Sequence, residues 1–269
     1  ALKNTIALIC FIILLLILKI PLWNDTFTNT QYIKFIISGF LGMGIADAVF
    51  IYALSKIGAN RIAILNCFEP IVIYFLTLFP FFIPGNWLTD IETVGFIIVI
   101  ISILIISYER DESDIPPKVK QQGLILQICA ILFSSISMVM IKNILNGYQN
   151  EPDVILWIAV LRLFVGFLIS WTIFLFLKDY KQLLKELRGR NLIIKVISSS
   201  ILGTFMALTC WIMGQAYIKK LALASIIGQT SLIFIMFFSW LFLREKITKT
   251  RIIASIFALI GVFLSNYFK

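Results

Sequence analysis

Two carboxylates lie inside apolar stretches in the first third of the chain, Asp47 and Glu69. These stretches predict two helices joined by the short polar turn SKIGANR at 55–61. An ionisable side chain at membrane depth costs roughly 2.5–3.5 kcal/mol unless it faces a cavity or a partner. Both acids are therefore interpreted as residues that bind a solute, a cation or a proton.

Glu69 is followed directly by Pro70 and lies three positions after Asn66, which places Asn66 and Glu69 on one helical face. Proline removes a backbone donor and predicts a bend that frees carbonyl groups beside the acid. One interpretation is a carboxylate that binds substrate or a proton. The alternative is a protonated glutamic acid that is hydrogen-bonded to a neighbouring helix.

Asp47 either binds a cation or pairs with Lys3 or Arg162 as a charge partner. Lys3 and Arg162 lie near the predicted ends of their spans, so snorkelling of the charged group to the membrane surface explains both. Arg162 also shares a helical stripe with Gly166 and Ser170, and the alternative is a role in a solute pathway. A separate stripe of small residues predicts a close helix contact: Gly39, Gly42, Ala46 and Ala53.

Polar side chains recur on one face of several other apolar segments. Each of them alone is explained by a hydrogen bond between helices, but together they favour a shared polar cavity. Stacking of Trp211 on a flat or cationic ligand is one interpretation, but ordinary packing is the favoured one. These polar residues are Gln127, Ser134 and Ser137, then Thr204, Trp211 and Gln215, and then Ser225 and Gln229.

The composition indicates a membrane protein. The 269 residues are 60% hydrophobic and only 14% charged, whereas soluble domains average about 25% charged residues. Apolar runs of membrane-spanning length follow one another with short connections, which is typical of an all-α polytopic protein. The net charge of +9 is explained by cations in short loops, so we expect the lipid bilayer as a partner and no nucleic acid.

The chain has no histidine, which argues against imidazole-based catalysis and His-ligated metals. Its four cysteines lie singly in apolar runs and are interpreted as packing residues. Phosphate-binding glycine loops and nucleophile motifs are also missing from the sequence. We therefore expect no cofactor, no metal and no enzymatic activity.

Nine membrane spans are predicted, separated by loops too short to hold a soluble domain. The longest loops are 108–122 and 178–191. No cleavable signal peptide is evident. The predicted spans are 5–22, 32–54, 60–82, 91–108, 123–142, 154–177, 192–216, 221–243 and 250–268.

Internal similarity divides the chain into two repeats. The stretch from Val160 resembles the stretch from Ala1, and FIYALSKIGANRIAILNCFEPIV from Phe50 aligns with IMGQAYIKKLALASIIGQTSLIF from Ile212. This predicts a first repeat at 1–109, a loop at 110–122 and a second repeat at 123–269. The first repeat begins at the equivalent of the second helix of the second repeat, so we expect ten helices in the parent protein, of which nine lie in this chain.

Repeats of five helices must cross the membrane in opposite directions, which predicts an inverted repeat. Equivalent loops carry opposite charge bias, since 85–90 has no cation while its equivalent around 244–251 has four. Fifteen lysines and arginines fall on one predicted side of the membrane and six on the other. The positive-inside rule then places the C-terminus outside.

The sequence resembles the EamA-type branch of the drug/metabolite transporter superfamily. The resemblance is carried by GFLGMGIADAVFIYALSKIGANRIAILNCFEP at 39–70, and by LREKIT at 243–248 followed by a closing helix that ends ALIGVFLSNYF. It implies ten helices in two inverted repeats, alternating access, and both termini in the cytoplasm, in contrast to the charge count. The acidic position that reads Glu245 in the second repeat reads Asn86 in the first.

The favoured hypothesis is a secondary carrier in the plasma or inner membrane, monomeric or homodimeric. It would move a small metabolite, amino acid or amphipathic drug-like solute, coupled to an ion or by exchange. The alternative is a membrane-embedded enzyme or a non-transporting assembly subunit. The predicted substrate- or proton-binding residues are Glu69, Asp47, Asn66, Gln127, Ser134, Trp211, Gln215 and Gln229, with Arg162 and Lys3 as possible charge partners.

Overall fold

The computed structural model describes residues 1–78, 87–107, 116–176, 190–238, 241 and 249–267, and the structural statements below concern these residues. They form helices joined by short connections, which confirms the all-α prediction. Several elements of the sequence analysis lie outside the described residues: Asn86, Glu245, the loop at 178–189 and the LREKIT motif.

The first helices follow the predicted spans closely. Helix α1 covers Leu2–Ile17, and α2 (Asn29–Ser38) continues through a π-helical segment, η1 (Gly39–Ala46), into α3 (Asp47–Asn66). The expected turn within 55–61 is a kink at Gly58, which has a φ of 78°. A residue with a Cβ is disfavoured in this left-handed conformation, so glycine suits the kink.

The next helices are α4 (Glu69–Thr77), α5 (Asp90–Ser107), α6 (Pro117–Gly147) and α7 (Pro152–Leu175). Helix α6 begins six residues before the predicted span at 123–142 and ends five residues after it. The first turns of α6 are polar, so a prediction that relies on hydropathy does not include them in the span. Pro117 at the first helical position suits this start, because proline lacks the amide hydrogen that a first turn leaves unused.

The second half of the chain repeats this arrangement. Helix α9 (Arg190–Ser200) continues through η2 (Ile201–Met206) into α10 (Ala207–Tyr217). It is followed by α11 (Leu221–Gln229), α12 (Ser231–Phe238) and α13 (Lys249–Tyr267). The π-helical segments begin at Gly39 and Ile201, which are equivalent positions when the alignment of Phe50 with Ile212 is extended without a gap.

Among the described residues, four helices are long and apolar enough to cross a membrane by length and composition: Asn29–Gly58, Pro117–Gly147, Pro152–Leu175 and Leu192–Tyr217. Two shorter apolar helices cover Leu2–Ile17 and Ile252–Leu264. Large apolar side chains are exposed along them, for example Leu202, Ile253 and Phe257. Exposed apolar surface of this extent suits a lipid environment, and the chain is a polytopic membrane protein.

The described helices group into two compact units, and each unit draws on both sequence repeats. The first unit contains 1–48 and 136–217, and the second contains 49–135 and 218–269. The division at 1–109 and 123–269 is a division of sequence and stays a prediction. The long helix α6 contributes its first part to the second unit and its last part to the first.

In the first unit, equivalent helices make equivalent contacts. Helix α1 packs against α9 and η2, while α7, the repeat equivalent of α1, packs against η1 and α2. Glycines permit the second contact, because a Cβ on Gly39 would lie 2.7 Å from the carbonyl oxygen of Arg162. A Cβ on Gly166 would likewise lie 2.9 Å from the carbonyl oxygen of Met43. The small residue at Gly39 therefore marks a close helix contact, as its stripe predicts.

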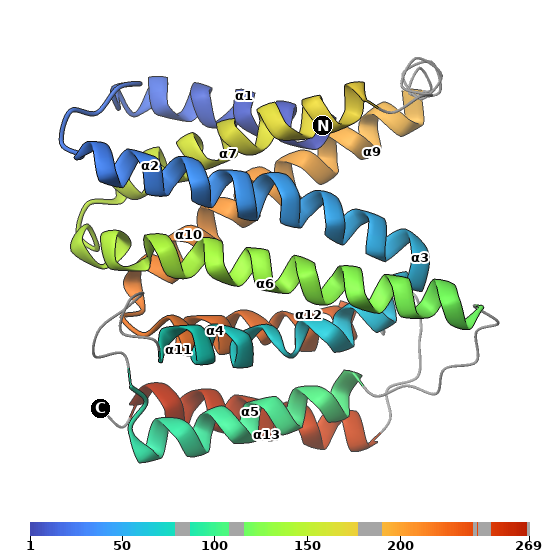
Figure 1. Ribbon diagram of the computed structural model, residues 1–269. Helices are drawn as coiled ribbons and strands as arrows, with labels where there is room; N and C mark the ends of the chain where they lie inside the picture. The colour runs from blue at the N-terminus through green and yellow to red at the C-terminus, as the bar shows by residue number, and fades with distance from the viewer. Residues whose placement is uncertain (79–86, 108–115, 177–189, 239–240, 242–248, 268–269) are drawn as a thin grey trace. The chain divides into compact units, whose positions relative to one another are not determined.

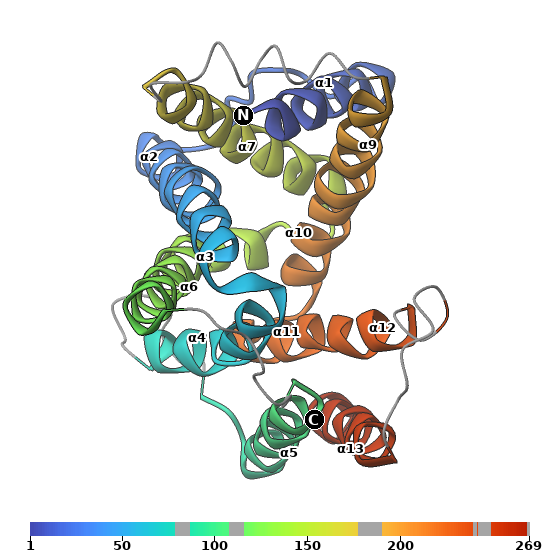
Figure 2. The ribbon, with the colours of Figure 1, turned by 90° about the vertical axis from the view of Figure 1, so that its right-hand side faces the viewer.

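In the second unit, one pair of repeat equivalents packs together, α5 with α13. Helices α5 and α13 run side by side along their length in Figures 1 and 2, and α4 packs against α11. A Cβ on Gly261 would lie 2.8 Å from the carbonyl oxygen of Gly95, so the α5 and α13 backbones approach closely there. The contact between α5 and α13, which are equivalent in the two repeats, is what an internal repeat leads us to expect.

Candidate functional site

Within the described residues, two of the predicted spans are interrupted at equivalent repeat positions. Helix α3 ends at Asn66 and α4 begins at Glu69, where the Phe68 amide donates to the Leu65 carbonyl oxygen at 3.0 Å. In the repeat alignment Phe68 corresponds to Thr230, whose amide donates to the Ile227 carbonyl oxygen at 3.0 Å between α11 and α12. Broken helices in corresponding spans are a feature of binding sites in secondary transporters.

The interruption before α4 has a clear local cause. Pro70 lies in the first turn of α4 and carries no amide hydrogen. In a continuous helix that hydrogen would bond to the carbonyl oxygen of Asn66, four residues earlier. The side-chain nitrogen of Gln229 takes this place, donating to the Asn66 carbonyl oxygen at 3.2 Å. Sequence reasoning expected freed carbonyls beside Glu69, but it did not place Gln229 on one of them.

The interruption after α11 needs no proline. Thr230 directs its hydroxyl back to the carbonyl oxygen of Ile227, at 2.6 Å. A threonine hydroxyl that bonds to the preceding turn competes with the helical hydrogen bonds and favours a bend. Two different residues, Pro70 and Thr230, therefore accompany the same interruption in the two repeats.

A polar group surrounds the interruption between α3 and α4, and it includes Glu69 and two side chains of α6. Gln127 donates from Nε2 to Oδ1 of Asn66 at 2.7 Å, and Ser134 donates to Oε1 of Glu69 at 3.3 Å. Gln127 and Ser134 are seven residues apart on α6, so they lie on one face of that helix. The group formed by Asn66, Glu69, Gln127, Ser134 and Gln229 is called the Glu69 cluster below.

The Glu69 cluster has unused hydrogen-bonding capacity. Gln127 is 1% exposed, and its Oε1 has no hydrogen-bond partner. Ser134 is the one described hydrogen-bond donor to the Glu69 side chain, although an ionised carboxylate offers about four acceptor positions. Glu69 also lies in the first turn of α4, where the helix dipole favours negative charge. The cluster can therefore accept a proton, a cation or a hydrogen-bonding solute.

The other predicted residues lie in the first unit. Lys3 Nζ lies 3.1 Å from Oδ2 of Asp47, and both side chains are more than 40% exposed. Arg162 does not pair with Asp47. It lies near the middle of α7 and is 1% exposed, so snorkelling to the membrane surface does not describe it. The predicted span placed Arg162 near its end, but the packing of η1 against α7 encloses the side chain.

Gln215 and Trp211 are one turn apart on α10. The carbonyl oxygen of Gln215 accepts a hydrogen bond from Nζ of the fully buried Lys142. The side-chain Oε1 of Gln215 is buried without a hydrogen-bond partner, and Trp211 is partly buried. The predicted residues thus divide between the two units, and the shared cavity that their pattern favoured stays a prediction.

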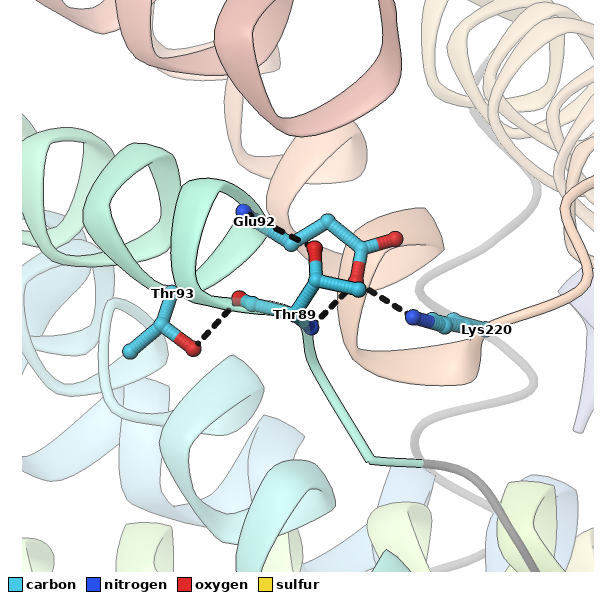
Figure 3. A network of polar contacts seen from close by, with 4 residues as sticks. All are labelled: Thr89, Glu92, Thr93 and Lys220. Carbon is cyan, nitrogen blue, oxygen red and sulfur yellow. Dashed lines mark hydrogen bonds and ion pairs between the residues drawn. The ribbon is translucent and has the colours of Figure 1, made fainter. Parts of the chain in front are cut away.

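One polar network was missed by sequence reasoning. Figure 3 shows Glu92 on α5 bound by three groups: its Oε2 accepts from the Thr89 amide at 2.6 Å and from Nζ of Lys220, and its own amide donates to the Thr89 hydroxyl at 3.4 Å. Glu92 is 3% exposed, and Lys220 is the N-cap of α11. The Thr-Asp-Ile-Glu pattern at 89–92 is a capping box, which could have identified the α5 start.

Comparison with known proteins agrees with this architecture. The family model of the EamA-like transporter family matches residues 2–108 and 121–267. Solved structures share the fold: one, titled "Crystal structure of protein", has a TM-score of 0.69 and 14% sequence identity, and the match covers 99% of this chain and 86% of that one. A search of curated proteins found no match. The chain belongs to the EamA-like transporter family and is a membrane transporter of the drug/metabolite type.

Proposed function

We propose that this protein is a secondary carrier that moves a small metabolite, amino acid or amphipathic solute by alternating access. The observation that carries the proposal is the pair of interrupted helices at equivalent repeat positions, joined by the hydrogen bond from Gln229 to Asn66. Interrupted helices leave main-chain groups available at membrane depth, where such groups are tolerated only against protein or a polar cavity.

Within this proposal Glu69 is the charge-bearing group. It alternates between binding a proton or cation and binding a donor group of the solute, while Ser134 orients it by the hydrogen bond to Oε1. Asn66 and Gln127 hold the interrupted end of α3 through their side-chain hydrogen bond. The unpartnered Oε1 of Gln127 supplies an acceptor for the solute. Coupling follows because solute and proton compete for one carboxylate.

The test is uptake by purified protein in proteoliposomes, with and without an imposed pH gradient. Radiolabelled amino acids, amines, sugars and nucleotides are supplied in turn. We expect gradient-driven accumulation of at least one class, and loss of that accumulation in Glu69→Gln. The matched control is Glu151→Gln, which removes an exposed carboxylate at the start of α7 and should transport normally.

Two results would contradict the proposal. Gradient-driven uptake by Glu69→Gln at every pH would remove this carboxylate from the mechanism. Chemical turnover of a solute without any flux would favour a membrane-embedded enzyme instead. Folding of the variant is checked by size-exclusion chromatography and thermal unfolding in detergent, so that a loss of transport is not a loss of structure.

A further inference from the structure

A buried guanidinium in the first unit has only weak partners. Arg162 is 1% exposed, and its Nη2 donates to the Ser137 hydroxyl at 3.1 Å while its Nη1 lies 3.7 Å from the sulfur of Met138. Its Nε is buried and has no hydrogen-bond partner. A guanidinium offers five N–H donors and keeps its charge at neutral pH, so a hydroxyl and a thioether satisfy it poorly.

No described carboxylate neutralises this charge. In the described residues of the first unit, Asp47 is paired with Lys3, and Asp25 accepts from the indole nitrogen of Trp23 at 2.6 Å. Glu151 and Asp153 are exposed at the start of α7, at least about 13 Å along the helix axis from Arg162 by the helical rise. Burial of an uncompensated charge is expensive, so a purely structural role for Arg162 is poorly supported.

The Ser137 hydroxyl is itself fixed in place. It donates to the main-chain oxygen of Ser38 at 2.8 Å, and Ser38 returns a hydrogen bond to the main-chain oxygen of Ser137 at 2.8 Å. The hydroxyl hydrogen of Ser137 is therefore already used. A lone pair of the same hydroxyl oxygen accepts from Nη2 of Arg162 and holds the guanidinium in one orientation. The remaining N–H groups of the guanidinium are left for another acceptor.

Other buried polar atoms of the first unit also lack partners. Unsatisfied buried groups of this kind are rare and indicate a bound ligand, ion or water. They lie on elements that pack against one another, since α1 contacts α7 and η2, and α10 contacts α7 and η2. Three atoms on these elements are Asn4 Oδ1, Thr204 Oγ1 and Gln215 Oε1.

We propose that Arg162 anchors an oxyanion-binding site in the first unit, which takes a carboxylate or phosphate group. A planar guanidinium fork binds such groups through two parallel hydrogen bonds, more specifically than lysine does. The identification of the anion as cargo rests on the proposed carrier function. The binding site itself does not, because it can be measured without any transport.

The experiment is thermal unfolding of the detergent-purified protein with matched probes. The probes are L-leucine against L-leucinamide, which differ in the carboxylate, and pyruvate, succinate, L-glutamate and inorganic phosphate. A short-chain phosphatidylglycerol is added separately to test a lipid headgroup as the source of the oxyanion. The variants are Arg162→Met and Arg162→Lys, and the control is Lys195→Met, which removes an exposed cation of the same unit.

We expect at least one oxyanion to raise the Tm of the wild type by roughly 5 °C at saturating concentration, since ligand binding stabilises the folded state. The neutral partner should not do so. The shift should vanish in Arg162→Met, shrink in Arg162→Lys and persist in Lys195→Met. Without ligand, Arg162→Met should unfold at or above the wild-type Tm, because it removes an uncompensated buried charge.

Stabilisation by phosphatidylglycerol alone, dependent on Arg162, would support the site and assign it to a lipid headgroup. A wild type that no probe stabilises would overturn the proposal, as would an oxyanion shift that survives in Arg162→Met. A fall in the ligand-free Tm of Arg162→Met together with an unchanged oxyanion response would assign Arg162 a structural role. Transport that fails while Arg162-dependent binding persists would count against the carrier function alone.

Discussion

Gln229 donates a hydrogen bond from its side chain to the main-chain oxygen of Asn66, 3.2 Å away and 163 residues apart in the chain. Each residue ends a helix, α11 for Gln229 and α3 for Asn66. The bond therefore joins the interruptions of two equivalent spans within the second unit. It also occupies the carbonyl group that Pro70 leaves without its helical partner.

Gln229→Ala should destabilise the protein by about 1–2 kcal/mol, because it leaves the part-buried Asn66 carbonyl without a donor. Pro70→Ala supplies an amide hydrogen that can bond to the same carbonyl. The double variant should therefore be more stable than the sum of the single effects by about 1 kcal/mol. Unfolding in denaturing detergent gives the free energy of unfolding of the wild type, the two single variants and the double variant. Strict additivity would show that Pro70 and Gln229 do not act on the same carbonyl.

The ion pair of Glu92 and Lys220 should also contribute to the free energy of unfolding. Lys220→Met leaves the 3% exposed Glu92 carboxylate without its cation, and a loss of about 1–3 kcal/mol in unfolding free energy is expected. Glu92→Gln keeps an acceptor for the Thr89 amide and should lose less. Lys118→Met is the control, since Lys118 is an exposed lysine of the same unit. Equal effects at 118 and 220 would exclude a specific pair of Glu92 and Lys220.

Gly39→Ala should destabilise the protein by about 1–3 kcal/mol, because the added Cβ would lie 2.7 Å from the Arg162 carbonyl oxygen. Gly203→Ala is the control at a π-helical position of the second repeat, where a Cβ meets nothing within 4 Å. It should be neutral or stabilising, since alanine favours helix over glycine. Thermal unfolding compares the two. A Gly39→Ala variant as stable as Gly203→Ala would contradict the close contact.

Asp47→Asn should change stability by less than about 1 kcal/mol, because the Lys3–Asp47 pair is more than 40% exposed on both sides. Its effect on uptake in proteoliposomes separates the two interpretations of this acid. If Asp47 only pairs with Lys3, then Lys3→Met and Asp47→Asn should behave alike and transport normally. Loss of uptake in Asp47→Asn alone would give the carboxylate a role in the transport cycle.

The sequence carried the information that is local along the chain. Apolar runs of membrane length located the described helices, and the internal alignment of Phe50 with Ile212 located equivalent positions. The three-residue spacing of Asn66 and Glu69 placed both in one polar group, and Pro70 indicated freed carbonyls nearby. Such inferences hold because hydropathy, helical periodicity and the missing proline donor act over a few residues.

The tertiary structure determined which residues distant in the sequence contact one another. Hydropathy does not show that Thr230 interrupts a span, that Gln229 reaches Asn66, or that Lys220 reaches Glu92 from 128 residues away. The burial of Arg162 was also beyond the sequence, because it depends on the close packing of η1 against α7 at Gly39. Nor does sequence order show that both repeats contribute to each unit. These features arise from helix packing between distant segments, which the local pattern of residues does not encode.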